Sequence, residues 1–172
     1  MIRPNFETSL KKGAVGEMIV RRNLEGKGWV IYEPVTDGAH CFDMMGIKDK
    51  KTAIALDVKA KARMNKWPAT GINQQHFDEY QHFSLRHNMP FWVVFVDEAQ
   101  RTIYGNTIQE LEKERIVNGQ VYPFQIETKY GKKIRLWPLA SMIEIDVISD
   151  EDSDRLIMFN QRGHEYCEQG TV

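Results

Sequence analysis

The sequence has few cysteines, no long hydrophobic run and almost no net charge. Its 172 residues include only Cys41 and Cys167, which are far apart and form no CxxC pair. This pattern argues against a disulfide framework and against a zinc site of thiolates, and it favours a reducing compartment. No apolar run is long enough to span a bilayer, and the opening MIRPNFETSLKKG lacks the apolar core of a signal peptide. We therefore expect a cytoplasmic protein with no membrane partner.

Several catalytic patterns are also missing. The five histidines show no HxxxH or HExxH spacing, so zinc hydrolase chemistry is not indicated. His164 and Cys167 supply at most half of a zinc site. No Ser-His pair stands in a recognisable hydrolase motif, and no pattern calls for a small-molecule cofactor. The histidines in question are His40, His76, His82, His87 and His164.

The near-neutral total conceals an uneven distribution of charge. The chain has 23 Lys and Arg against 24 Asp and Glu, a formal net charge of −1, which argues against an overall basic protein of histone-like or ribosomal type. Residues 1–66 nevertheless carry 13 basic against 8 acidic residues, or +5, whereas residues 67–172 carry 10 against 16, or −6. A local basic face is therefore expected in the first part of the chain.

Hydrophobic periodicity predicts an α-β-β-β-α-β core. Apolar residues recur at helical spacing in KGAVGEMIVRRNLEG, and the run FWVVFVD is typical of a buried central strand. The charged turn KDKK joins the second and third predicted strands into a hairpin. The predicted elements are a helix at 12–26, strands at 29–34, 41–47 and 52–60, a helix from about 72 to 88, and a strand at 91–97.

The rest of the chain predicts additions to that core. A short strand at 101–105 and a short helix from Asn106 precede a second hairpin, formed by QVYPFQIET and KKIRLWPL around the turn KYGK. A last helix is predicted at about 150–162. We expect one α/β (α+β) domain over residues 1–172 with a mixed central sheet. Its core would span about 12–105, and a C-terminal hairpin and helix would lie within about 106–172.

The strand predicted at 52–60 carries polar residues on one face. Its apolar residues alternate with Asp57, Lys59 and Lys61, so the period of two places one acid and two amines in a row. Asp43 lies on the partner strand of the predicted hairpin, so its carboxylate can converge with that of Asp57. Oxygen ligands of this kind suit Mg²⁺ or Mn²⁺. Lys59 would project toward the same place, where an amine can position water or offset charge on a phosphate.

This constellation resembles the PD-(D/E)xK nuclease superfamily, especially its small members similar to archaeal Holliday-junction resolvases. The resemblance covers roughly residues 12–97, about half of the chain. It implies a restriction-endonuclease-like fold and cleavage of DNA with a divalent metal. The residues that carry it are Glu17 in the first helix, Asp43, the D-x-K triplet Asp57-Val58-Lys59, and a glutamine in the following helix.

The resemblance also implies roles for these residues. Asp43, Asp57 and the carbonyl of Val58 would bind Mg²⁺ or Mn²⁺, and Glu17 would support the metal or its water. Lys59 would be the catalytic lysine. The glutamine found in several branches of the superfamily would be Gln75 or, as the alternative, Gln74.

Three departures from the motif bear on these roles. Phe42 stands before Asp43 where the motif has proline, and Asp57 is shorter than the glutamate often found at its position. Lys61 shares the face of Lys59, so the identity of the catalytic lysine stays open. Glu17 also stands four residues before Arg21, a spacing at which the two could form a surface ion pair instead.

A basic surface is expected beside this site. A loop with several cations and one aromatic residue can hold backbone phosphates and stack on an unpaired base. We expect DNA to approach a face built from residues 11–66, with an affinity that falls steeply with salt. The candidate nucleic-acid-binding residues are Lys61, Arg63, Lys66 and Trp67 in the loop, and Lys12 and Arg21 in the first helix.

The sequence thus predicts a Mg²⁺- or Mn²⁺-dependent DNA nuclease, an endonuclease that acts in DNA processing, repair, recombination or restriction. The alternative is a catalytically inactive nucleic-acid-binding or scaffolding module on the same fold. A homodimer follows by analogy with small nucleases of this type. The preferred DNA structure, endo or exo cleavage, and RNA as a substrate are left open by the residues.

Overall fold

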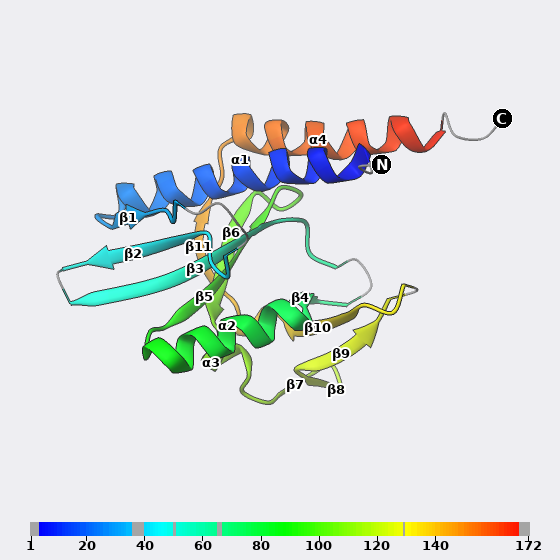
Figure 1. Ribbon diagram of the computed structural model, residues 1–172. Helices are drawn as coiled ribbons and strands as arrows, with labels where there is room; N and C mark the ends of the chain where they lie inside the picture. The colour runs from blue at the N-terminus through cyan, green and yellow to red at the C-terminus, as the bar shows by residue number, and fades with distance from the viewer. Residues whose placement is uncertain (1–3, 36–39, 50, 65–66, 129, 169–172) are drawn as a thin grey trace.

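The computed structural model describes residues 4–35, 40–49, 51–64, 67–128 and 130–168, with side chains between residues 7 and 159 of these ranges. Its centre is a six-stranded mixed sheet (Figure 1). None of the helices in the described part of the chain is both long and apolar enough to cross a membrane. In order across the sheet, the strands are β1 (Val30–Tyr32), β2 (Met44–Lys48), β3 (Thr52–Ala60), β5 (Phe91–Asp97), β6 (Thr102–Thr107) and β11 (Ile143–Val147).

The two central strands of this sheet run parallel, and the other pairs are antiparallel. β3 pairs with β5 from Ala55↔Phe91 to Ala60↔Val96. The β2–β3 hairpin is in the register Met44↔Leu56. Parallel strands require a crossover connection, which here contains β4 and α2. The apolar composition of β5 agrees with its position, because a central strand is covered on both faces.

Helices cover both faces of the six-stranded sheet (Figure 1). The long helix α1 (Pro4–Gly26) and α4 (Asp150–Glu168) lie side by side over one face. The other face is covered by α2 (Gln74–His87), the short α3 (Ile108–Leu111) and the 3₁₀ turn η1 (Leu139–Ser141). The mixed α/β class expected from the sequence is confirmed.

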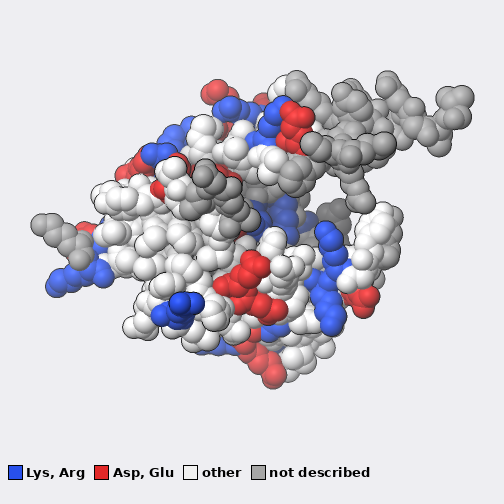
Figure 2. Space-filling model, viewed as in Figure 1, with Lys and Arg blue, Asp and Glu red and all other residues white. Residues whose placement is uncertain are grey.

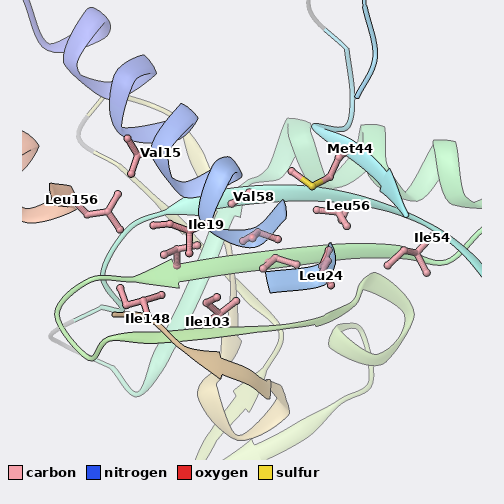
Figure 3. Close-up of a cluster of buried hydrophobic side chains, with 13 residues drawn as sticks. Val15, Ile19, Leu24, Met44, Ile54, Leu56, Val58, Ile103, Ile148 and Leu156 are labelled. Atoms are coloured by element: carbon pink, nitrogen blue, oxygen red, sulfur yellow. The ribbon is translucent and has the colours of Figure 1, made fainter. Parts of the chain in front are cut away.

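Each face of the sheet has its own hydrophobic cluster. On the α1 side, Val15, Ile19 and Leu24 from the helix pack against Leu56 and Val58 of β3 (Figure 3). The other side chains of β3 point the opposite way, where Ala55 belongs to the cluster beneath α2. The alternation in β3 therefore sends its even-numbered residues toward α1 and its odd-numbered residues toward α2.

Helix α1 approaches β3 closely at one point. A Cβ added to Gly16 would lie 2.7 Å from the Cβ of Ala60, which is too close for two carbon atoms. Glycine at this position therefore allows the helix backbone to touch the end of β3. The residue after it, Glu17, is placed directly above that end.

A second, smaller sheet lies beside α2. Its central strand β10 (Lys133–Pro138) pairs antiparallel with β4 (Ala69–Asn73) on one side and β9 (Phe124–Glu127) on the other. β7 (Arg115–Val117) and β8 (Gln120–Tyr122) form a separate hairpin. At Gly71 a Cβ would lie 2.0 Å from the carbonyl oxygen of Arg135, so glycine is needed for β4 and β10 to approach.

The structure extends or changes several predicted elements. The first helix begins at Pro4, eight residues before the predicted start at residue 12. Residues 69–71 were expected in a loop and residues 72–73 in the helix that follows, but residues 69–73 form β4, because β10 pairs with them. Residues 143–147 add the edge strand β11, which pairs with β6. The predicted hairpin of β9 and β10 and the last helix are present.

Candidate active site

The β2–β3 hairpin leaves an open edge on β3. β2 begins at Met44, opposite Leu56, so the part of β3 that follows Leu56 has no strand on that side. Asp43 lies against this edge: its backbone N–H donates to the Leu56 carbonyl at 3.0 Å, and its Oδ2 accepts from the Val58 N–H at 2.6 Å. Backbone groups of alternate strand residues point the same way, so the Val58 carbonyl faces the same open edge.

Asp57 and Lys59 form an ion pair on the α2 side of this edge. The Nζ of Lys59 is 2.6 Å from Oδ2 and 2.9 Å from Oδ1 of Asp57. Asp57 is buried, and burial raises the pKa of its carboxyl to about 6; Lys59 opposes this rise, and Asp43 adds to it. Because the buried Oδ2 has no well-aligned hydrogen-bond donor, Asp57 keeps the capacity to bind a further cationic group.

Tyr80 of α2 faces the same carboxylate. Burial, followed by the charge of Asp57, raises the pKa of Tyr80, so its hydroxyl stays protonated beside Asp57. Tyr80 was not among the site residues predicted from the sequence. The sequence signal for Tyr80 is its phenol hydroxyl, which stands among apolar residues on one face of this helix, since a buried hydroxyl needs a polar partner.

Glu17 approaches the site from α1. It is half-buried, and burial, together with the charge of Asp43, raises the pKa of its carboxyl, whereas Lys59 lowers it. The alternative ion pair with Arg21 does not form, because Arg21 donates to Glu25 and Glu33, both at 3.0 Å. Glu17 lines a hollow of about 270 Å³. The residues that line it are Ser9, Leu10, Gly13, Glu17, Asp43, Val58, Lys59, Ala60 and Lys61.

The donor set of this hollow fits a hard divalent cation. Asp43, Asp57 and the Val58 carbonyl offer oxygen atoms, and Mg²⁺ is usually held by one or two carboxylates while it keeps several waters. The proximity of Asp43 to both Glu17 and Asp57 raises the pKa of each, which shows that three carboxylates share one region. Within the described ranges, no three His, Cys, Asp or Glu side chains already form a chelating group. A metal would therefore depend on water or phosphate for its remaining ligands.

The two lysines of the polar face have different surroundings. Lys61 donates to the backbone carbonyl of Gly71 in β4, and its ammonium lies 5.5 Å from the centre of the Phe95 ring. Burial lowers the pKa of Lys61 to about 8. Lys59 contacts the carboxylate of Asp57, whereas Lys61 links β3 to the small sheet.

The two candidate glutamines bond to groups outside the acidic cluster. Gln75 is exposed at the start of α2 and donates to Glu79 at 3.2 Å. Gln74 donates to Asp78 at 2.7 Å and accepts from Gln125 of β9 at 2.7 Å. Neither glutamine is among the residues that line the hollow.

The structure pairs most of the candidate nucleic-acid-binding cations with acids. Lys12 forms a partly buried ion pair with Glu98 at 2.5 Å, and Arg63 donates to the fully buried Asp97 at 2.7 Å. Trp67 packs edge-on against Phe124, with ring centres 6.0 Å apart. Lys66 lies outside the described residues. These contacts pair Arg63 of the loop and Lys12 of α1 with acids and pack Trp67 against β9.

Comparison with known proteins identifies the fold. No protein-family model and no curated protein sequence matches this chain. Its structure is similar to that of Archaeoglobus fulgidus Hjc, a Holliday junction resolvase from an archaeal hyperthermophile, over 78% of this chain and 92% of that chain, with 14% sequence identity and a TM-score of 0.53. The two chains share a fold. The restriction-endonuclease-like fold expected from the sequence is thereby confirmed.

A viral protein gives a second, weaker match. A nuclease from a fusselovirus aligns over 94% of this chain and 98% of its own, with 10% sequence identity and a TM-score of 0.48.

Proposed function

We propose that this chain is a DNA endonuclease that uses a divalent metal, Mg²⁺ or Mn²⁺, and acts as one nuclease-like domain over residues 1–172. The observation that carries the proposal is that Asp43, Lys59 and Glu17 line one hollow at the open edge of β3, with the carboxylate of Asp57 paired to Lys59 beside it. The shared fold with a Holliday junction resolvase supports the same chemistry.

Asp43, Asp57 and the Val58 carbonyl would hold the metal. A bound divalent ion would offset charge on the scissile phosphate and lower the pKa of a coordinated water. Asp43 is held in place for this role, because its Oδ2 accepts from the Val58 N–H and the residue lines the hollow. Glu17 would accept a hydrogen bond from the attacking water, since its carboxylate faces the hollow from α1.

Lys59 would have two successive partners in the reaction. In the structure its ammonium is bound to Asp57. Were that carboxylate to hold a divalent cation, Lys59 would be free to turn toward water or phosphate in the hollow. There it would orient the nucleophile and stabilise negative charge in the transition state. Lys61 stays bound to Gly71, so Lys59 is the better candidate for the catalytic lysine.

Cleavage assays test this proposal. Supercoiled, linear, single-stranded and four-way-branched DNA would each be incubated with Mg²⁺, Mn²⁺ or chelator. We expect chelator-sensitive cleavage, reduced at least about 100-fold in Asp57→Asn and in Lys59→Ala, because each removes a charged group from the transition state. Lys51→Ala serves as the control, since this exposed lysine lies at the β2–β3 turn, at the far end of the hairpin.

Two outcomes would contradict the nuclease. One is full activity in Lys59→Ala, and the other is the absence of chelator-sensitive cleavage on every substrate. DNA binding without any cleavage would favour the inactive binding module instead. A cytoplasmic location, DNA as the substrate and a homodimer that cuts both strands complete the proposal, and light scattering of the purified protein measures the oligomeric state.

A further inference from the structure

The positive charge of the first part of the chain is largely compensated within the fold. Acids that are distant in sequence pair with several of its cations, and close acids pair with others. Because a paired cation loses much of its attraction for a phosphate, the sequence excess of +5 overstates the field that DNA would meet. The pairs are Lys11–Glu7, Lys12–Glu98, Arg21–Glu25, Arg21–Glu33, Arg22–Asp152, Lys27–Asp146, Lys59–Asp57 and Arg63–Asp97.

The β9–β10 hairpin shows the opposite situation. Lys132 and Lys133 at its tip are exposed, and neither has an acid within ion-pair distance among the described residues. Lys133 stands opposite Glu127 in the strand register, but the two side chains form no ion pair. These lysines lie in the part of the chain with a net charge of −6, so the sequence sum gives no indication of them.

Hydrogen bonds fix the position of the hairpin tip. The Thr128 N–H donates to the Lys132 carbonyl at 2.8 Å, and the Lys132 N–H donates to Oγ1 of Thr128 at 3.1 Å. Gly131 has a φ of 74°, which allows the tight turn between them. These bonds therefore fix where Lys132, and Lys133 after it, leave the turn.

The same tip lies next to the candidate active site. β10 pairs with β4 at Ile134↔Asn73, so its first residues lie beside the start of α2. His76, in the first turn of α2, has a pKa lowered by burial and then by the charges of both Lys59 and Lys132. The hydrogen bond between Lys61 and the Gly71 carbonyl joins the catalytic strand to the same small sheet.

The figures show this arrangement from one side. In Figure 1 the β9–β10 hairpin projects below the layer of α1 and α4, on the side toward which β3 ends. In Figure 2 Lys and Arg side chains lie between the helical layer and the hairpin region. The catalytic hollow and the hairpin lysines can therefore face one extended ligand.

We propose that the β9–β10 hairpin binds the phosphate backbone of DNA beside the catalytic hollow, with Lys132 and Lys133 as the phosphate contacts. This inference rests on the proposed nuclease function. Duplex DNA carries about one negative charge per 1.7 Å of its axis, so exposed and uncompensated lysines next to the cleavage site bind it without regard to sequence. The hairpin then forms one wall of the DNA-binding cleft, and the end of α1 with the edge of β3 forms the other.

DNA binding in the presence of chelator tests the hairpin, because no cleavage then occurs. The fluorescence anisotropy of a labelled duplex would be titrated with protein at several KCl concentrations. For Lys132→Ala/Lys133→Ala we expect an affinity at least about tenfold weaker and a slope of log K against log salt smaller by about 2, one unit for each lost phosphate contact. Lys132→Arg/Lys133→Arg should bind like the wild type, since it keeps both charges.

Two further variants control for the loss of charge as such and for the sign of the effect on DNA affinity. Lys51→Ala/Arg86→Ala removes the same charge from exposed positions at the opposite end of the molecule, at the β2–β3 turn and the C-terminal end of α2. Its salt slope should equal that of the wild type. Glu127→Gln removes the acid opposite Lys133 and should strengthen binding.

The outcomes test the hairpin proposal and the nuclease proposal separately. If the alanine pair binds with the affinity and slope of the wild type, or if the control pair loses as much, the hairpin proposal is wrong while the cleavage assays still decide the nuclease. If no substrate is cleaved, the nuclease fails, and the binding titration still decides the hairpin. A wild-type protein that binds no DNA would overturn both. Equal melting temperatures of all variants exclude a loss of folding as the cause.

Discussion

At the scale of single residues, the buried carboxylate of Asp57 determines the character of the site. Its charge is separated from water, and only Lys59 among the described residues pairs with it directly. A buried carboxylate with one cationic partner is costly to keep ionised. The fold therefore holds a group whose environment improves when a second cation arrives.

The pKa of Asp57 predicts how stability depends on pH. This pKa is raised from an ordinary 3.8 to about 6, so the native state binds the proton more tightly than the unfolded state. The free energy of unfolding therefore falls as the pH rises from about 4 to above 6. In chelator at pH 8, Asp57→Asn should be more stable than the wild type by about 1 to 3 kcal/mol, and the difference should vanish near pH 4. Urea unfolding at both pH values measures it.

Asp146 provides a control of opposite sign. Hydrogen bonds from Lys27 and then Asn23 lower the pKa of this exposed carboxyl to about 2. Its contribution is present above pH 4 and is lost as the pH falls toward 2. Asp146→Asn should therefore lose stability at pH 8, by less than about 1 kcal/mol because solvent screens the pair. If Asp57→Asn is instead less stable than the wild type at pH 8, the buried charge of Asp57 has no net cost in the free energy of unfolding.

The sequence predicts these acids better than it predicts their partners. Asp57 and Lys59 are recognisable because they interrupt an apolar strand at a period of two. Asp43 follows from the hairpin that brings its strand alongside. The sequence does not distinguish Lys59 from Lys61, since both share one face of the strand. The carbonyl that binds Lys61 belongs to Gly71, in a strand that forms only by pairing with the distant β10.

At the scale of elements, the contact between α1 and β3 determines where Glu17 stands. Gly16→Ala would place a Cβ 2.7 Å from that of Ala60, so the helix must move away from the strand. We expect a loss of about 1 to 3 kcal/mol in the free energy of unfolding and a loss of cleavage activity, since Glu17 moves with the helix.

Gly13 supplies a matched control in the same helix. The nearest atom to a Cβ at this position is Oε1 of Glu17 at 3.9 Å, an ordinary contact. Gly13→Ala should therefore stabilise the protein by about 0.5 to 1 kcal/mol through helix propensity. Thermal unfolding of both variants gives the comparison. Equal effects of the two substitutions would refute the close approach of α1 to β3.

Elements defined by local pattern are predictable, and elements defined by a distant partner are not. The run 91–97 and the alternating strand 52–60 were predicted because burial shows in their own residues. β4, with the sequence ATGIN, has no such pattern and becomes a strand only because β10 bonds to it. β11 was not predicted, because its pairing with β6 depends on residues about forty positions earlier.

At the scale of the whole molecule, charge must be counted in space as well as along the chain. The sequence places the excess of positive charge in residues 1–66. The fold brings Asp97, Glu98, Asp146 and Asp152 from the acidic part onto those cations. Within the described part of the chain, it leaves Lys132 and Lys133 without an ion-pair partner. The polarity of the surface therefore differs from the polarity of the sequence.

A divalent cation should stabilise the whole molecule. A ligand that binds only the native state adds about 2.7 kcal/mol at a hundred times its Kd, which raises the Tm of a chain of this size by roughly 5 °C or more. We expect this increase with Mg²⁺ or Mn²⁺ and its reversal by chelator. Thermal unfolding would show no increase in Asp43→Asn or Asp57→Asn, whereas Asp146→Asn keeps it. An increase that persists in all three variants would place the cation elsewhere.

The hydrogen bonds between Thr128 and Lys132 have a consequence for engineering and for divergence. They close a turn at an exposed end of the small sheet, and β3 precedes that turn by more than sixty residues. Insertions are best tolerated at exposed turns, because few buried contacts depend on their length. The reach of the hairpin can therefore be lengthened or shortened without any change to Asp43, Asp57 or Lys59. If the chain is the proposed nuclease, the shape of DNA that it binds and the cleavage that it performs can then change independently of each other.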